Sequence, residues 1–345
     1  MQHTVYDRNH TFHVNLSYRK RPGDTIAWIN KMEENGTIMA KELSNQAKWK
    51  PWKGVVLFVI AFVWLIVGSI ASYFLGTYAT LIIQLGFLGI AIAACLINKT
   101  PLKEVFPIRK FTARDFFGTI LMWLGAMPLG LLSGVIVGKF MPETFTNVTA
   151  GLNEMTTSVV VIGLIATVIC PPICEEAIMR GAVLSNFRSV KKDWVIIIII
   201  GIMFGILHTD PIRFINTSLM GGCLAYLMVK RNNILLPAIY HFANNLVTMG
   251  MSTISTLTAQ QAGQAIDASE ATAAAVDALP SLMLMAFLSP LFLVIGIHLI
   301  KRQTEIAEGK EKSGMKLGAK IGLSVIPCVL LLGGGIALTV MSMNI

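Results

Sequence analysis

Long apolar runs, separated by short polar segments, dominate the pattern along the chain. The first of them, "GVVLFVIAFVWLIVGSIASYFLG" at 54–76, is typical of the rest. A helix needs roughly 20 apolar residues to cross about 30 Å of hydrocarbon, and these runs reach that length. We interpret nine segments as membrane spans: about 54–76, 78–97, 116–138, 157–174 with a continuing helix, 194–208, 213–229, 234–250, 281–300 and 320–343. The pattern predicts an all-α polytopic membrane protein, a bundle of about eight or nine transmembrane helices.

Composition supports the membrane assignment. The 345 residues are 54% hydrophobic and only 14% charged, and the mean hydropathy is +0.66, whereas ordinary soluble domains carry about 25% charged residues. The net charge of +9 would suit a nucleic-acid-binding protein, but the basic residues lie beside the apolar runs. We therefore expect the lipid bilayer, and not nucleic acid, as the partner of these charges. The cysteines all fall inside apolar segments without a CxxC pair, which favours buried thiols over a disulfide framework.

Lysine and arginine predict the orientation in the membrane. They gather in 1–53, 98–115, 180–192 and 301–320, whereas the connection at 251–280 has none. Because cytoplasmic loops carry the excess of basic residues, we expect a cytoplasmic N-terminus and a C-terminus on the outside. In a bacterium the membrane would be the plasma membrane. The first 53 residues lack the apolar region of a cleavable signal peptide.

Two adjacent glutamates and an arginine stand where an apolar run has not yet ended, in "VICPPICEEAIMRGAV" at 168–183. A charge at the bilayer centre costs about 2.5–3.5 kcal/mol, so such residues mark candidate functional sites. Glu176 and Arg180 are four residues apart and can pair on one helix face. Glu175 points about 100° away from that face and can meet other helices. We expect Pro171 and Pro172 to break the helix just before the glutamates.

Later spans carry polar residues with the same spacing. His241 and Asn245 share a face of the seventh span, and Phe204 and His208 repeat the spacing on the fifth. Glu175 and His208 lie about equally far from a predicted turn at Lys191–Lys192, so a hairpin of antiparallel helices brings them to the same height. Their depth in the membrane stays open at this point.

The polar set suggests hydrolysis of a peptide bond by activated water. Glu175 beside His208 can deprotonate a water molecule, while His241 and the Asn245 amide can donate hydrogen bonds to a developing oxyanion. Alternatively, Glu175, His208 and His241 form a two-histidine, one-carboxylate zinc set with an open position for water. The first reading requires no cofactor and the second requires zinc. The residues by themselves are compatible with both.

Three motifs together resemble a known family. "EEAIMR" (175–180), "FGILH" (204–208) and "HFANN" (241–245) reproduce, in order, the EExxxR, FxxxH and HxxxN pattern of the CPBP intramembrane proteases. This family is also called the Abi or CAAX-protease family. The resemblance implies Glu175 and His208 as the activators of water, and His241 with Asn245 as stabilisers of the oxyanion. It implies supporting roles for Glu176 and Arg180, while Phe204 is interpreted as packing beside the site. The family has been described both as metalloproteases and as glutamate-dependent.

The resemblance also suggests how the chain is divided. It covers roughly 115–300, the predicted protease core. Residues 1–53 would form a cytoplasmic tail, in which "TIAWINKMEENGTIMAKEL" suits either an amphipathic surface helix or a flexible segment. Residues 54–114 would hold two accessory transmembrane helices, and 301–345 a basic loop with the last helix. The Ala-rich, acidic 252–279 segment is expected to form an external, helix-forming loop.

The implied substrate is a membrane-associated protein or peptide, of the CAAX type or similar to a bacteriocin leader peptide. Two other functions compete with it: a proton-coupled transporter that uses the same carboxylate and histidines, and a non-catalytic immunity or binding protein on the family scaffold. The residues do not predict an oligomeric state. Two further polar residues receive structural interpretations, His298 as structural or interfacial and Asp210 as ordinary turn chemistry before a proline.

Overall fold

A computed structural model describes residues 3–6, 11–14, 49–157, 160–261, 273–275, 277–309, 311 and 314–343. Near the N-terminus, β1 (His3–Tyr6) and β2 (Thr11–Val14) pair as antiparallel strands, with His3 opposite Val14. This short strand pair is an addition to the predicted all-helical fold. The proposed amphipathic helix in the tail lies outside the described residues, as does the middle of the 252–279 segment.

The rest of the described chain is helical, which confirms the predicted fold class. In order, the helices are α2 (Pro51–Leu75), α3 (Thr77–Ile97), α4 (Leu102–Val105), α5 (Ala113–Phe140), α6 (Pro142–Thr157), α7 (Val160–Leu164), η1 (Ile165–Ile169), α8 (Cys170–Glu176), η2 (Ala177–Val183), α9 (Asp193–Leu207), α10 (Pro211–Arg231), α11 (Leu235–Gln261), α13 (Leu279–Ala286), α14 (Ser289–Ala307) and α15 (Leu317–Met343). The two elements labelled η are π-helical.

Within the described ranges, seven helical segments are long and apolar enough to cross a membrane. They are Pro51–Leu75, Tyr78–Ile97, Ala113–Phe140, Val161–Val183, Pro211–Arg231, Leu279–Ala307 and Leu317–Met343. Of the nine predicted spans, those at 194–208 and 234–250 correspond to α9 and α11, which are not among the seven. The chain is therefore an integral, multi-pass membrane protein.

The shortness of α9 bears on the depth of the candidate site. Its 15 residues span roughly 22 Å, less than the ~30 Å of a hydrocarbon core. Lys191 and Lys192 precede its first residue, as the predicted turn requires. If this basic turn lies at the membrane surface, α9 ends within the apolar layer, and its C-cap residue His208 lies there with it.

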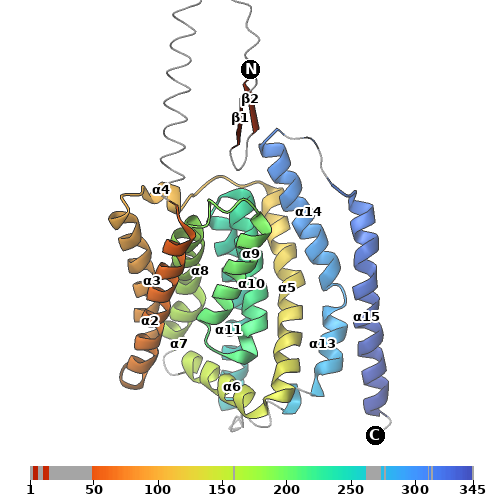
Figure 1. Ribbon diagram of the computed structural model, residues 1–345. Helices are drawn as coiled ribbons and strands as arrows, with labels where there is room; N and C mark the ends of the chain where they lie inside the picture. The colour runs from red at the N-terminus through yellow and green to blue at the C-terminus, as the bar shows by residue number, and fades with distance from the viewer. Residues whose placement is uncertain are drawn as a thin grey trace, which may run out of the picture.

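Small residues allow the central helices to approach closely. α9 packs against α10, and α5 against α14. A Cβ added to Gly221 on α10 would lie 2.7 Å from the Phe204 Cβ and 3.1 Å from the Gly201 Cα on α9, so only glycine fits there. By contrast, α2 and α3 lie at one side of the bundle and α15 at the other (Figure 1), and α2 and α15 expose many large apolar side chains, as lipid-facing helices do.

The prolines before the glutamates do not break the helix, contrary to the prediction. The helical path runs from Val160 to Val183, and Pro171 and Pro172 lie in the first turn of α8, directly after the π-helical η1. A proline ring clashes with the carbonyl four residues before it. The wider π-helical turn offers a physical account of how the helix continues through both prolines.

Two other boundaries also differ from the prediction. α11 continues to Gln261, past the expected end of its span at 250, because no glycine or proline interrupts the chain between Gly250 and Gln261. The span expected at 281–300 is present as one apolar segment, Leu279–Ala307, in which a turn at 287–288 separates α13 from α14 and Pro290 stands in the first turn of α14.

Candidate active site

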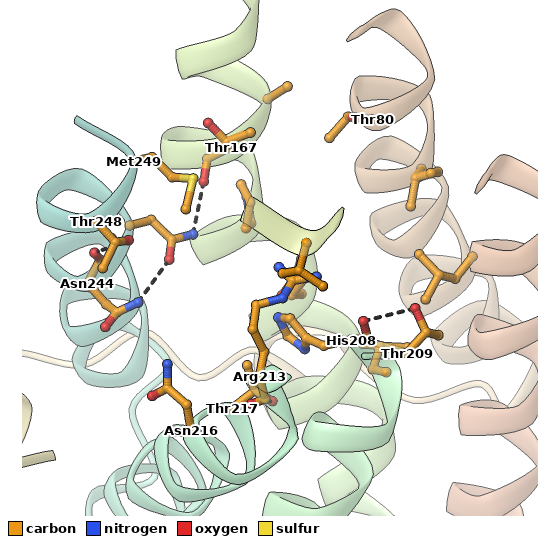
Figure 2. A pocket seen from close by; sticks show the side chains of 18 of the residues that line it. Thr80, Thr167, His208, Thr209, Arg213, Asn216, Thr217, Asn244, Thr248 and Met249 are labelled. Atoms are coloured by element: carbon orange, nitrogen blue, oxygen red, sulfur yellow. Dashed lines mark hydrogen bonds between the residues drawn. The ribbon is translucent and has the colours of Figure 1, made fainter. Parts of the chain in front are cut away.

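A cavity of about 870 Å³ gathers the predicted catalytic residues inside the bundle. Glu175, His208, His241 and Asn245 all line it, although they come from α8, the end of α9 and α11. Figure 2 shows His208 and Arg213 at one side of this cavity, Asn244 and Thr248 on α11, and Thr80 on α3 across from them. Glu175 and His208 therefore line the same cavity, although α9 packs mainly against α10 and not against α8 as the predicted hairpin would require.

Glu175 is buried, and its two carboxylate oxygens have different surroundings. Oε1 accepts a hydrogen bond from Nε2 of Gln84, at 2.7 Å. Oε2 has no hydrogen-bond partner among the described residues, and it lies 3.9 Å from Nε2 of His241. One oxygen is thus held by α3, while the other is left for a group in the cavity.

Glu176 has a different task from its neighbour, as the helical spacing predicts. Its Oε1 accepts hydrogen bonds from Nη1 of Arg180, at 3.1 Å, and from Nδ1 of His241, at 2.8 Å. All three side chains are buried. Because a carboxylate only accepts, Nδ1 of His241 carries a proton, and Nε2 of the same ring is turned toward Glu175.

His208 is oriented by its own helix. Its Nδ1 lies 2.9 Å from the carbonyl oxygen of Phe204. Since a carbonyl oxygen can only accept, Nδ1 is the donor in this hydrogen bond. A neutral His208 ring then has its lone pair on Nε2, where it can accept a proton or a hydrogen bond.

Phe204 packs as the sequence predicts, between the charged and the imidazole side chains. Its fully buried ring lies under the Arg180 guanidinium, 4.2 Å from the centroid, and contacts the rings of His208 and His241 edge-on. Arg180 is held further by a hydrogen bond from Nη2 to the carbonyl oxygen of Gly221, at 3.2 Å. These contacts fix the relative positions of α8, α9, α10 and α11.

Asn245 lines the cavity with one amide hydrogen bond already made. Its Nδ2 donates to the carbonyl oxygen of Thr167 on η1, at 2.9 Å, and its Oδ1 accepts from Nδ2 of Asn244, at 3.3 Å (Figure 2). The Thr167 carbonyl is available because Pro171 and Pro172, the residues four and five positions later, have no backbone N–H to donate to it. An amide nitrogen carries two hydrogens, so the second amide hydrogen of Asn245 can donate to a bound group.

The three residues suggested as zinc ligands do not form a ready metal site. In the part of the chain that the structure describes, no three His, Cys, Asp or Glu side chains converge closely enough to share one ion. Nε2 of His241 and Oε2 of Glu175 approach each other, but His208 does not join them as a third ligand.

Sequence reasoning missed two residues of the cavity. Gln84 is the one amide side chain in the apolar run of α3, and attention to uncharged polar residues within the spans would have found it. Arg213 lines the cavity beside His208 and is ion-paired with Asp210, whose carboxylate caps α10 by accepting from the Arg213 backbone N–H. Asp210 therefore has its expected turn role.

His298 lies on α14 and is not among the residues that line the cavity.

Comparison with known proteins identifies the same region. Residues 157–247 match the family model described as type II CAAX prenyl endopeptidase Rce1-like, a segment narrower than the predicted core at 115–300. Neither the comparison with curated proteins nor the comparison with solved structures found a match. The matched segment contains all three motifs and supports a protease function. Through it, the chain is similar to the Rce1-like CAAX endopeptidases, which confirms the resemblance to the CAAX-protease family that the motifs predict.

Proposed function

We propose that this chain is an intramembrane endopeptidase, in which Glu175 and His208 activate the water that hydrolyses a peptide bond. The observation that carries the proposal is the state of the Glu175 carboxylate: buried, fixed through one oxygen, and presenting the other beside two histidines in one cavity. A base held in this way can take a proton without first reorganising its surroundings.

The proposed reaction begins with water between Glu175 and Nε2 of His208. Oε2 of Glu175 takes one proton while the water oxygen attacks the carbonyl carbon of the substrate. The protonated Glu175 then returns this proton to the leaving amine as the C–N bond breaks. General acid–base catalysis of this kind contributes typically 10²- to 10⁴-fold, so its loss is easily measured.

The oxyanion would be stabilised by Nε2–H of His241 and by the remaining amide hydrogen of Asn245. Because Nδ1–H of His241 already donates to Glu176, a second donor on the same ring requires an imidazolium. Glu176 holds the ring in this orientation through its hydrogen bond with Nδ1. Arg180 holds Glu176 in place.

The proposed substrate is a membrane-associated protein or peptide, either of the CAAX type or similar to a leader peptide. Both polar and apolar side chains line the cavity, from α2, α3, α10 and α11, and such a lining suits a peptide backbone together with its apolar side chains. The proposed orientation has the N-terminus in the cytoplasm and the C-terminus outside, because the basic segments alternate along the chain.

The test is cleavage of a prenylated CAAX peptide, and of a leader-type peptide, by purified protein in proteoliposomes. Glu175→Gln keeps the size of the side chain but removes the base, so we expect cleavage to fall by at least ~10²-fold. His298→Gln is the matched control, a polar replacement on α14 outside the cavity, and it should retain activity.

Cleavage by Glu175→Gln at the rate of the unchanged protein would refute the mechanism. A wild-type protein that binds these peptides without cleaving them would favour a non-catalytic binding role, and substrate-dependent proton movement would favour a transporter.

A further inference from the structure

Among the described residues, Gln84 is the one outside the family-matched segment that forms a hydrogen bond with the proposed base. It lies on α3, which the resemblance alone assigned to an accessory region, and far in sequence from residues 157–247. Its Nε2 donates to Oε1 of Glu175 at 2.7 Å, and this is a buried contact between two side chains. The contact connects the first helical pair of the bundle directly to the proposed chemistry.

The surroundings of Gln84 argue against a purely structural use of this amide. α3 packs against α8, η1 and η2 through mostly apolar contacts, so the helices do not depend on one hydrogen bond to associate. Oε1 of Gln84 is buried without a hydrogen-bond partner among the described residues. A buried polar atom left in this way is costly. Leucine at this position would avoid that cost, so the amide is better explained by its single contact with Glu175.

In this contact the Gln84 amide donates a hydrogen bond to the carboxylate that is proposed as the base. An amide N–H bound to a carboxylate favours the ionised form and restricts the side chain to one orientation. With Oε1 occupied, proton transfer is directed to Oε2, the oxygen that faces His241. We infer that Gln84 is a positioning residue for Glu175, and that α3 is therefore part of the catalytic unit. This inference rests on the proposed function.

The predicted consequence is a loss in turnover without a loss in binding or stability. Hydrogen bonds to charged groups are the stronger class, so Gln84→Leu should lower kcat by about 10- to 100-fold while KM changes less than about 2-fold. Gln84→Glu places a second carboxylate against Oε1, and two like charges in one buried site disfavour each other. Its kcat should fall below that of Gln84→Leu.

Variants on α3 supply a control and also test the competing explanation, that Gln84 has only a structural role. Leu85→Met changes the residue next to Gln84 on α3, which is exposed and is not among the residues that line the cavity, and it should retain kcat. If Gln84 served only to hold helices together, Gln84→Leu would lower the temperature of unfolding together with activity. Because Gln84→Leu also removes the donor to the buried Oε1 of Glu175, we expect its unfolding temperature to fall no more than that of Glu175→Gln, while its kcat falls.

An independent readout separates this inference from the proposed function. In protein labelled with ¹⁵N-glutamine, the side-chain amide signal of Gln84 is identified by its absence in Gln84→Leu. Replacement of Glu175 by alanine should shift this signal and accelerate its hydrogen exchange. Failure of all peptides to be cleaved, with this shift present, would remove the proposed function but keep the contact. Unchanged kcat in Gln84→Leu, in an enzyme that Glu175→Gln inactivates, would overturn the inference alone.

Discussion

Removal of the buried cation at position 180 tests the architecture of the site most directly. Arg180 is fully buried and makes three kinds of contact: an ion pair with Glu176 at 3.1 Å, a hydrogen bond to the Gly221 carbonyl at 3.2 Å, and a contact with the Phe204 ring at 4.2 Å. Arg180→Met keeps the length and apolar stem of the side chain but removes its charge and donors. Glu176 would then be left buried as an ion, with His241 as its remaining partner.

The magnitude follows from the depth of this pair. Breaking a buried ion pair by removing one partner costs about 3–5 kcal/mol, because the other charge stays uncompensated. The cation–π contact contributes ~2 kcal/mol when desolvated, and this overlaps with the first figure. We expect Arg180→Met to lower the free energy of unfolding by about 3–5 kcal/mol. The double variant Glu176→Gln/Arg180→Met leaves no buried charge from the pair, so it should be more stable than Arg180→Met.

The assay is unfolding in mixed detergent micelles, with the wild type, both single variants and the double variant measured as one cycle. Glu175→Gln serves as the control for a neighbouring carboxylate that has no ion pair with Arg180, and it should unfold close to the wild type. An Arg180→Met protein within about 0.5 kcal/mol of the wild type would refute the argument, because surface substitutions have effects of that size. Full additivity in the cycle would also contradict a coupled buried pair.

Two further predictions concern the metal and the orientation. Because no three candidate ligands converge among the described residues, protein treated with a chelator and verified as metal-free should keep its activity; loss of cleavage that zinc restores would instead establish a metalloprotease. A reporter fused after Ile345 should be active on the outer side of the membrane, since alternate segments of the chain are basic. A cytoplasmic reporter signal would contradict the predicted topology.

The sequence predicted much of the helical bundle because length and hydropathy alone determine whether a helix can cross a membrane. It also paired Glu176 with Arg180, because residues four apart share a face of any α-helix. The prediction that Pro171 and Pro172 break the helix was wrong. The helix continues through them after a π-helical segment, and no simple sequence pattern predicts such a segment. The catalytic roles and the division of the chain into regions remain predictions.

By itself, the sequence determined that Glu175, His208, His241 and Asn245 were costly in a membrane and had to meet something polar. Only the tertiary structure decided what each of them meets. In the folded chain His241 forms a hydrogen bond with Glu176, Asn245 with the Thr167 carbonyl, and Gln84 with Glu175. The physical reason is that helical periodicity fixes which residues share a face, whereas the partner across an interface depends on how whole helices pack.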